Sequence, residues 1–141
     1  MKNGNPVALK TLAAAIISLT IAETALIAAG ILPPILSYSP GNLFFSLLRL
    51  ALAVYGGLLV AKKGLGAAAF NGALLLCASS LTICIATLIG TTYLGKPILG
   101  VAAPDAPSLI LVLSMVLIEN TLLGAILAAI AAFVSNKLRK D

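Results

Sequence analysis

Apolar residues form four long stretches along the chain, and polar residues gather in the short segments between them. The stretches run approximately over residues 8–36, 43–61, 65–94 and 108–134. A helix rises about 1.5 Å per residue, so about 20 apolar residues cross a hydrocarbon core roughly 30 Å thick. The pattern therefore predicts an all-α, polytopic membrane protein, a four-transmembrane-helix bundle that forms a single membrane domain over residues 1–141.

Turn-forming residues separate the predicted spans. Pro33 and Pro34 stop or kink the first helix because proline lacks a backbone N–H. Residues 37–42 then make a tight turn, and residues 62–64, two lysines and a glycine, close the second span. The segment 95–107 is rich in proline and glycine but includes apolar residues, so we expect it to lie at the membrane interface.

The composition agrees with a membrane protein. Of the 141 residues, 61% are hydrophobic and 9% are charged, whereas about 25% of the residues of a typical soluble domain are charged. A formal net charge of +5 would suit nucleic-acid binding, but the basic residues stand singly or in small groups beside the apolar stretches. We therefore expect the chain to sit in a lipid bilayer and to have no nucleic-acid partner.

The distribution of lysine and arginine predicts the orientation of the spans. If the four spans alternate in direction, Lys96 lies on one side of the membrane. All the other basic residues at span ends lie on the opposite side, namely Lys2, Lys10, Lys62, Lys63, Lys137, Arg139 and Lys140. Basic residues next to spans are enriched on the cytoplasmic side. We therefore expect a multi-pass protein of the cytoplasmic (cell) membrane with both termini cytoplasmic.

Away from their ends, the apolar stretches are interrupted by three charged residues: Glu23, Arg49 and Glu119. Counted from the lysine-rich ends of their spans, all three lie roughly 20 to 22 Å deep. Ser80 and Asn120 fall close to the same level. Ionisable residues inside a span usually face the bundle interior and find a partner there. The five residues together are therefore the candidate ion-binding or substrate-binding site, a buried polar cluster.

The charges of this predicted cluster do not balance. One guanidinium neutralises one carboxylate, so Arg49 leaves one negative charge in excess when both Glu23 and Glu119 are ionised. An excess charge is costly away from water unless the site holds a proton or a cation. We therefore expect a transport or proton/cation-translocation component. The alternative is that the charges only hold helices together, in a non-catalytic structural or assembly subunit of a larger membrane complex.

The sequence offers no recognisable set of metal or haem ligands, because it has no histidine and its two cysteines and two methionines are scattered. We expect no metal and no cofactor. No nucleophile, base and orienting group can be assembled by spacing, so we do not expect an enzyme. Small residues recur along the last span at Gly124 and Ala128, as in helices that pack closely in lipid. We expect a homo-oligomer or other membrane subunits as partners.

Overall fold

The computed structural model describes residues 6–101 and 105–138. Within them the chain forms four long helices and two short 3₁₀ helices: α1 (Pro6–Ala28), η1 (Ile35–Ser37), α2 (Pro40–Leu59), η2 (Ala61–Lys63), α3 (Leu65–Tyr93) and α4 (Ala106–Leu138). Each of the four α-helices is long and apolar enough to cross a membrane. The prediction of an all-helical chain with four such helices is confirmed.

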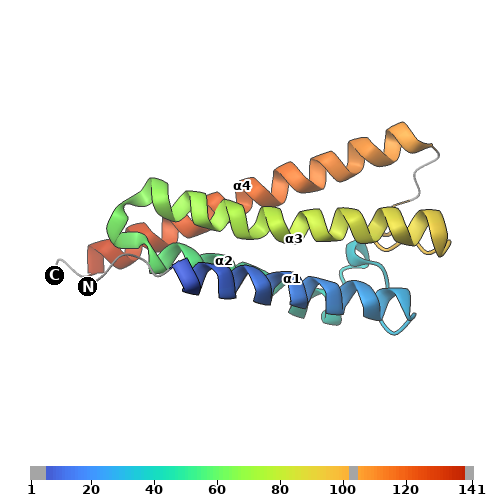
Figure 1. The fold of residues 1–141 in the computed structure, drawn as a ribbon, viewed down its shortest axis with the longest axis horizontal. Coiled ribbons are helices and arrows are strands. Elements are labelled where there is room, and N and C mark those ends of the chain that lie inside the picture. The colour runs from blue at the N-terminus through green and yellow to red at the C-terminus, as the bar shows by residue number, and fades with distance from the viewer. Residues whose placement is uncertain (1–5, 102–104, 139–141) are drawn as a thin grey trace.

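The four long helices lie side by side and alternate in direction (Figure 1). The start of α1, the connection between α2 and α3, and the end of α4 lie at one end of the bundle; the other two connections lie at the opposite end. Helix α3 packs against each of the other three helices, and α4 is inclined to it (Figure 1). Most of the buried side chains therefore belong to the inner faces of α1, α2 and α3.

The observed helices differ at several ends from the predicted stretches. Helix α1 ends at Ala28, well before residue 36, because Gly30 takes a left-handed backbone conformation (φ 77°) that turns the chain. Helix α2 begins at Pro40 rather than at residue 43. The Ser39 hydroxyl accepts a hydrogen bond from the Asn42 N–H at 3.2 Å, and proline suits the first turn of a helix. Helix α4 extends beyond both predicted limits of 108–134.

Small residues let α4 approach α3 and α2 closely. A Cβ atom added at Gly72 would overlap the carbonyl oxygen of Gly124, and one added at Gly124 would overlap the carbonyl oxygen of Gly72. A Cβ at Gly57 of α2 would lie 2.6 Å from the Cβ of Ala128. The predicted small residues Gly124 and Ala128 are thus buried at the helix crossing, as expected where backbones pack directly in lipid.

The two connections at the far end of the bundle hold each other in place. The N–H groups of Ile35 and Leu36 donate to the carbonyl oxygens of Ile98 and Leu99 at 3.0 and 3.1 Å. Ile98 and Leu99 are themselves buried. Ile98 and Leu99 therefore close this end of the bundle, and the location of the segment 95–107 at the membrane interface stays a prediction.

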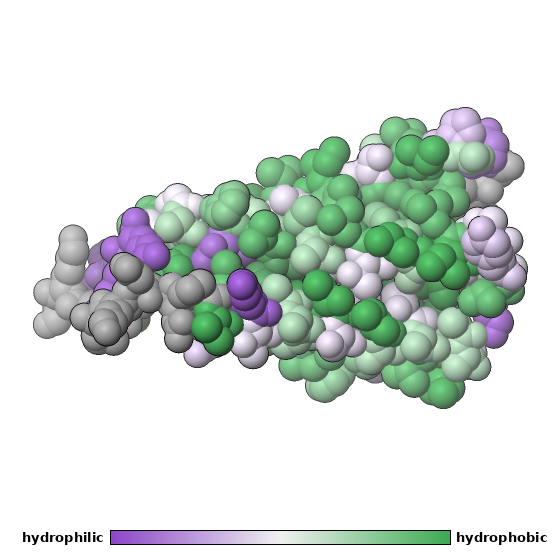
Figure 2. Space-filling model, in the orientation of Figure 1, coloured by the Kyte–Doolittle hydropathy of each residue, from purple (hydrophilic) through white to green (hydrophobic). Residues whose placement is uncertain are grey.

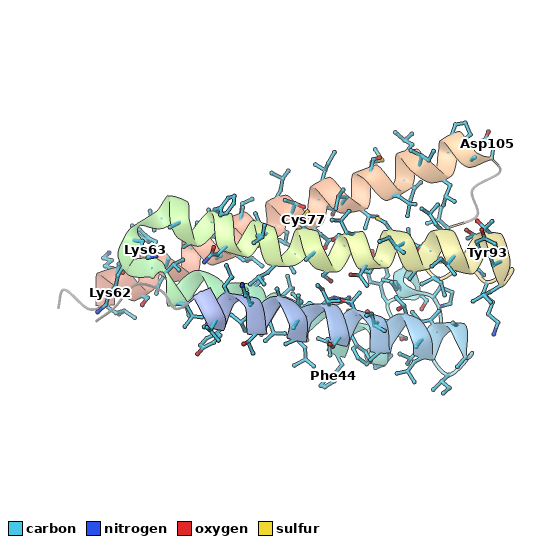
Figure 3. The ribbon with its side chains drawn as sticks, viewed as in Figure 1. Phe44, Lys62, Lys63, Cys77, Tyr93 and Asp105 are labelled. Atoms are coloured by element: carbon cyan, nitrogen blue, oxygen red, sulfur yellow. The ribbon has the colours of Figure 1, made fainter. Side chains whose placement is uncertain are left out.

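The surface is apolar over the middle of the bundle and polar at its ends. Figure 2 shows hydrophobic residues across the middle of the face drawn, with hydrophilic residues toward each end. Lys62 and Lys63 mark one end, and Tyr93 and Asp105 mark the other (Figure 3). Such a girdle is what four membrane-spanning helices require. Of the basic residues used to predict the orientation, Lys2, Arg139 and Lys140 lie outside the described residues.

Candidate functional site

The central polar feature of the bundle is an ion pair between α1 and α2. Arg49 Nη1 donates to Glu23 Oε2, and Arg49 Nη2 donates to Ser46 Oγ at 3.0 Å. The Glu23 residue is 0% exposed and Arg49 only 6%. Ser46 lies three residues before Arg49, so both side chains fall on the same face of α2. A charge pair removed from water in this way depends on its partner, because either group alone would be an uncompensated buried charge.

A second polar contact connects α1 to α3 one turn away from Glu23. The Thr20 hydroxyl donates to the carbonyl oxygen of Ile16 at 2.8 Å, which uses its only hydrogen. In the 2.9 Å hydrogen bond between Thr20 and Ser79, the Ser79 hydroxyl is therefore the donor. Both residues are buried. The two contacts place Glu23, Arg49 and Ser79 around one interior region shared by three helices.

A cavity of about 140 Å³ opens beside Arg49. Its polar lining comes from three helices and comprises Ser46, Arg49, Ser79, Ser80 and Asn120, and the remaining lining residues are leucines and isoleucine. One buried water needs about 10 to 15 Å³ of such volume. The cavity therefore has room for several waters or one small polar solute, and its polar side is built around a guanidinium group.

Several polar atoms around this cavity lack a hydrogen-bond partner within the part of the chain that the structure describes. The Ser80 hydroxyl makes no hydrogen bond although the residue is only 1% exposed. The Asn120 amide donates one N–H to the Val116 carbonyl at 2.9 Å, and no bond to its carbonyl oxygen is formed. Glu23 does not line the cavity, but its Oε1 is also buried and unpaired. Unpaired buried polar groups are costly, so they indicate where a water, a proton or a ligand binds.

The structure brings together four of the five residues that the sequence singled out. Glu23 and Arg49 form the ion pair, and Ser80 and Asn120 line the cavity with Arg49. Glu119 does not join them: its side chain is exposed on the outer face of α4 and forms no ion pair or hydrogen bond with any described residue. Successive residues of a helix point about 100° apart, so Asn120 faces inward while Glu119 faces outward.

The charge balance of the site changes as a result. The sequence predicted two carboxylates against one guanidinium, but the buried charged residues in the described part of the chain are one carboxylate, Glu23, and one guanidinium, Arg49. The excess negative charge predicted for the cluster is therefore missing from it. The depth count along the spans says nothing about the direction of a side chain around its helix, and this is why it grouped Glu119 with the others.

Three residues of the interior were not among the predicted site residues: Thr20, Ser46 and Ser79. For two of them a simple spacing rule was available, because Ser46 and Thr20 lie three residues before Arg49 and Glu23 on the same helix faces. Ser79 is the neighbour of Ser80 in the sequence, and adjacent helix residues do not share a face. No such rule indicated that Thr20 and Ser79 would meet, because their helices are far apart in the sequence.

The described residues contain no group of three or more His, Cys, Asp or Glu side chains that could hold a metal ion. No protein-family model matches the chain, and no curated protein and no solved structure matches it. The class of protein is therefore defined by the fold and the site alone: a chain with four helices able to cross a membrane, built around a buried glutamate–arginine pair and a small polar cavity.

Proposed function

We propose that this protein is a small transport component of the cell membrane whose pathway passes through the cavity beside Arg49. The observation that carries the proposal is the buried Glu23–Arg49 pair, with an adjoining polar cavity, between apolar helices. Ionisable residues at such depth usually mark substrate or ion pathways. The unpaired Glu23 Oε1 supplies a place for a proton.

Helix packing alone would not call for this arrangement. Well-packed apolar residues often stabilise a fold as well as a buried ion pair does, and the crossing of α3 and α4 already packs through glycine and alanine. A pair kept only for assembly also has no use for a polar cavity next to it. A proton on Glu23 would free the guanidinium of Arg49 for a ligand in that cavity. Protonation of Glu23 would then be coupled to ligand binding at Arg49, as proton-driven transport requires.

A liposome assay tests the proposal. The purified chain is reconstituted with a pH-sensitive dye inside the vesicles, a pH gradient is imposed, and the rate of its decay is compared with that of empty vesicles. We expect faster decay with the natural chain and a loss of this activity in Glu23→Gln. Glu119→Gln is the matched control, because it removes a carboxylate that does not face the cavity. Decay no faster than in empty vesicles, whichever salt is present, would contradict the proposal.

The proposed orientation places the lysine-rich end of the bundle in the cytoplasm, by the positive-inside rule. Lys62 and Lys63 lie at that end, and Asp105 lies at the other (Figure 3). In a chain without Cys77 and Cys84, we expect a cysteine at Lys63 to react with an impermeant reagent only from inside the cell, and one at Asp105 only from outside. Labelling of both from the same side would contradict the orientation.

Glu119 favours a second candidate, an assembly subunit of a homo-oligomer or a larger membrane complex. Its exposed carboxylate stands among the exposed apolar side chains of Met115, Ile118 and Leu122 on the outer face of α4. A carboxylate in contact with lipid is costly, and a neighbouring helix with a polar or basic group at that depth would relieve the cost. Purification from native membranes tests this: a defined set of partners that is lost in Glu119→Leu supports the assembly role, and a chain that purifies alone opposes it.

A further inference from the structure

The charge of the cavity depends on whether Glu23 is ionised. With both partners charged, the Glu23–Arg49 pair is neutral. Arg49 from α2 is the one charged group in contact with Glu23 in the described chain, because Glu119 of α4 points outward and Lys10 lies near the start of α1. Tyr55 on α2 is exposed, and no hydrogen bond joins Cys77 or Cys84 of α3 to Glu23. A proton on Glu23 would therefore leave one uncompensated positive charge on the cavity wall.

The cavity offers hydrogen-bond donors and no negative charge. Arg49 has five N–H groups, of which Glu23 and Ser46 each take one. Ser80 adds an unpaired hydroxyl, and Asn120 adds the second N–H of its amide. No acidic side chain lines the cavity. A cation would find little to bind here, whereas a small anion would meet a guanidinium and donors from two other helices.

We infer that the cavity binds one small inorganic anion, such as chloride or nitrate, on Arg49 while Glu23 holds a proton. The inference rests on the proposed transport function and names its substrate class. A hydronium ion transfers its proton to an oxygen of Glu23 and leaves as water, the neutral carboxyl group releases the guanidinium, and the anion takes its place as counter-charge. Proton and anion then occupy the site together as a neutral pair. When the proton leaves, the carboxylate displaces the anion from Arg49.

The volume agrees with this substrate class. Sites for drug-sized molecules usually measure about 300 to 1,000 Å³, and this cavity measures about 140 Å³. A cavity of this volume suits a small ion with a few of the water molecules of its first hydration shell. Because the proton and the anion favour each other's binding, each raises the affinity of the site for the other by the same factor.

Proteoliposomes with the same pH inside and outside test the inference. An inward gradient of potassium chloride or potassium nitrate should acidify the lumen, because each anion enters with a proton, whereas potassium gluconate should not. The acidification should persist when valinomycin clamps the membrane potential, since the pair is neutral. Ser80→Ala should weaken chloride binding about tenfold, the size expected for one hydrogen bond to a charged ligand. Ser114→Ala, a hydroxyl on the outer face of α4, is the matched control and should have no effect.

A measurement on the natural chain keeps the inference testable if substituted chains fail to fold. In unbuffered detergent solution, sodium chloride should cause uptake of protons from the solvent, and sodium gluconate should not. Proton flux that needs sodium or potassium and ignores the choice of anion would overturn the anion inference and leave the proposed transport function standing. Absence of both proton flux and anion flux would overturn both.

Discussion

Glu23 and Glu119 are two carboxylates at comparable depth with opposite surroundings. Glu23 of α1 is fully buried and paired with Arg49. Glu119 of α4 lies on the outer face of its helix and has no partner among the described residues. Each is the only acidic residue of its apolar helix, so their local sequences look alike. The difference arises from the direction in which each side chain leaves its helix.

This comparison shows what a buried charge in a membrane span signifies. An ionised carboxylate inside the hydrocarbon core raises the free energy of the folded chain. The groups that surround it determine whether this cost is offset. Glu23 meets it inside the chain through Arg49, beside a polar cavity. Glu119 has no such partner among the described residues, and a proton or a neighbouring helix would meet this cost. The first arrangement supports the proposed transport role, and the second supports the proposed assembly role.

The largest expected effect is that of removing the partner of the buried carboxylate. Arg49→Leu leaves Glu23 without a counter-charge, and breaking a buried ion pair costs about 3 to 5 kcal/mol of folding free energy. The free energy of unfolding, measured in detergent by titration with a denaturing surfactant, should fall by that order. Adding Glu23→Gln to Arg49→Leu should recover much of the loss. An unchanged free energy of unfolding in Arg49→Leu would mean that the pair does not hold Glu23.

The next effect tests the close contact that orients α4. Gly72→Ala places a methyl group against the backbone of Gly124, and overpacking of this kind costs about 1 to 3 kcal/mol. Because α4 must shift, Asn120 should also move away from the cavity. Gly66→Ala in the same helix is the control, since a Cβ there meets nothing within 4 Å. Equal stability of the two substituted chains in the same unfolding assay would contradict the close crossing.

Glu119→Gln should have a much smaller effect on the folded chain. An exposed side chain without partners contributes little, so the free energy of unfolding in detergent should change by no more than about 0.5 kcal/mol. Glu23→Gln, the matched change at the buried position, should destabilise the chain because Arg49 then lacks its counter-charge. If the two glutamine substitutions cost the same, the contrast between the inner and outer carboxylates is wrong.

The smallest effect concerns Asp105, an exposed acidic residue at the end of the bundle opposite Lys62 and Lys63 (Figure 3). Its Oδ1 accepts the Ser108 N–H at 2.8 Å before the first turn of α4. Hydrogen bonding by Ser108, through its side chain and through this N–H, holds the pKa of Asp105 below its ordinary value of 3.8. A lowered folded-state pKa stabilises the helix start above the ordinary pKa, and the contribution is lost as the pH falls through the lowered one. Hydrogen exchange at the Ser108 amide should therefore be protected near neutral pH.

That protection should weaken when the solution is acidified below the lowered pKa of Asp105. Asp105→Asn is the control, because asparagine caps helices about as well as aspartate but does not titrate. Its Ser108 amide should be protected to the same degree at both pH values, after correction for intrinsic exchange. A pH dependence that survives in Asp105→Asn would assign the effect to another group.

Much of the architecture followed from the sequence because membrane helices obey a strong local rule. In lipid every backbone N–H and C=O must be paired within the segment, so a long apolar stretch forms a helix. Helix ends were harder to predict. The ends of α1 and α2 depend on the left-handed Gly30 and on the cap at Ser39, which are details of a few backbone angles rather than of hydropathy.

The sequence by itself determined the four apolar helices and the polar residues that each contains. It also determined how far along each helix the charged residues lie. Tertiary structure alone decided that Arg49 faces Glu23, that Thr20 meets Ser79, and that Glu119 turns outward. Those outcomes depend on the rotation of each helix about its axis. That rotation is set by close contacts such as the one between Gly72 and Gly124, which join helices far apart in the sequence.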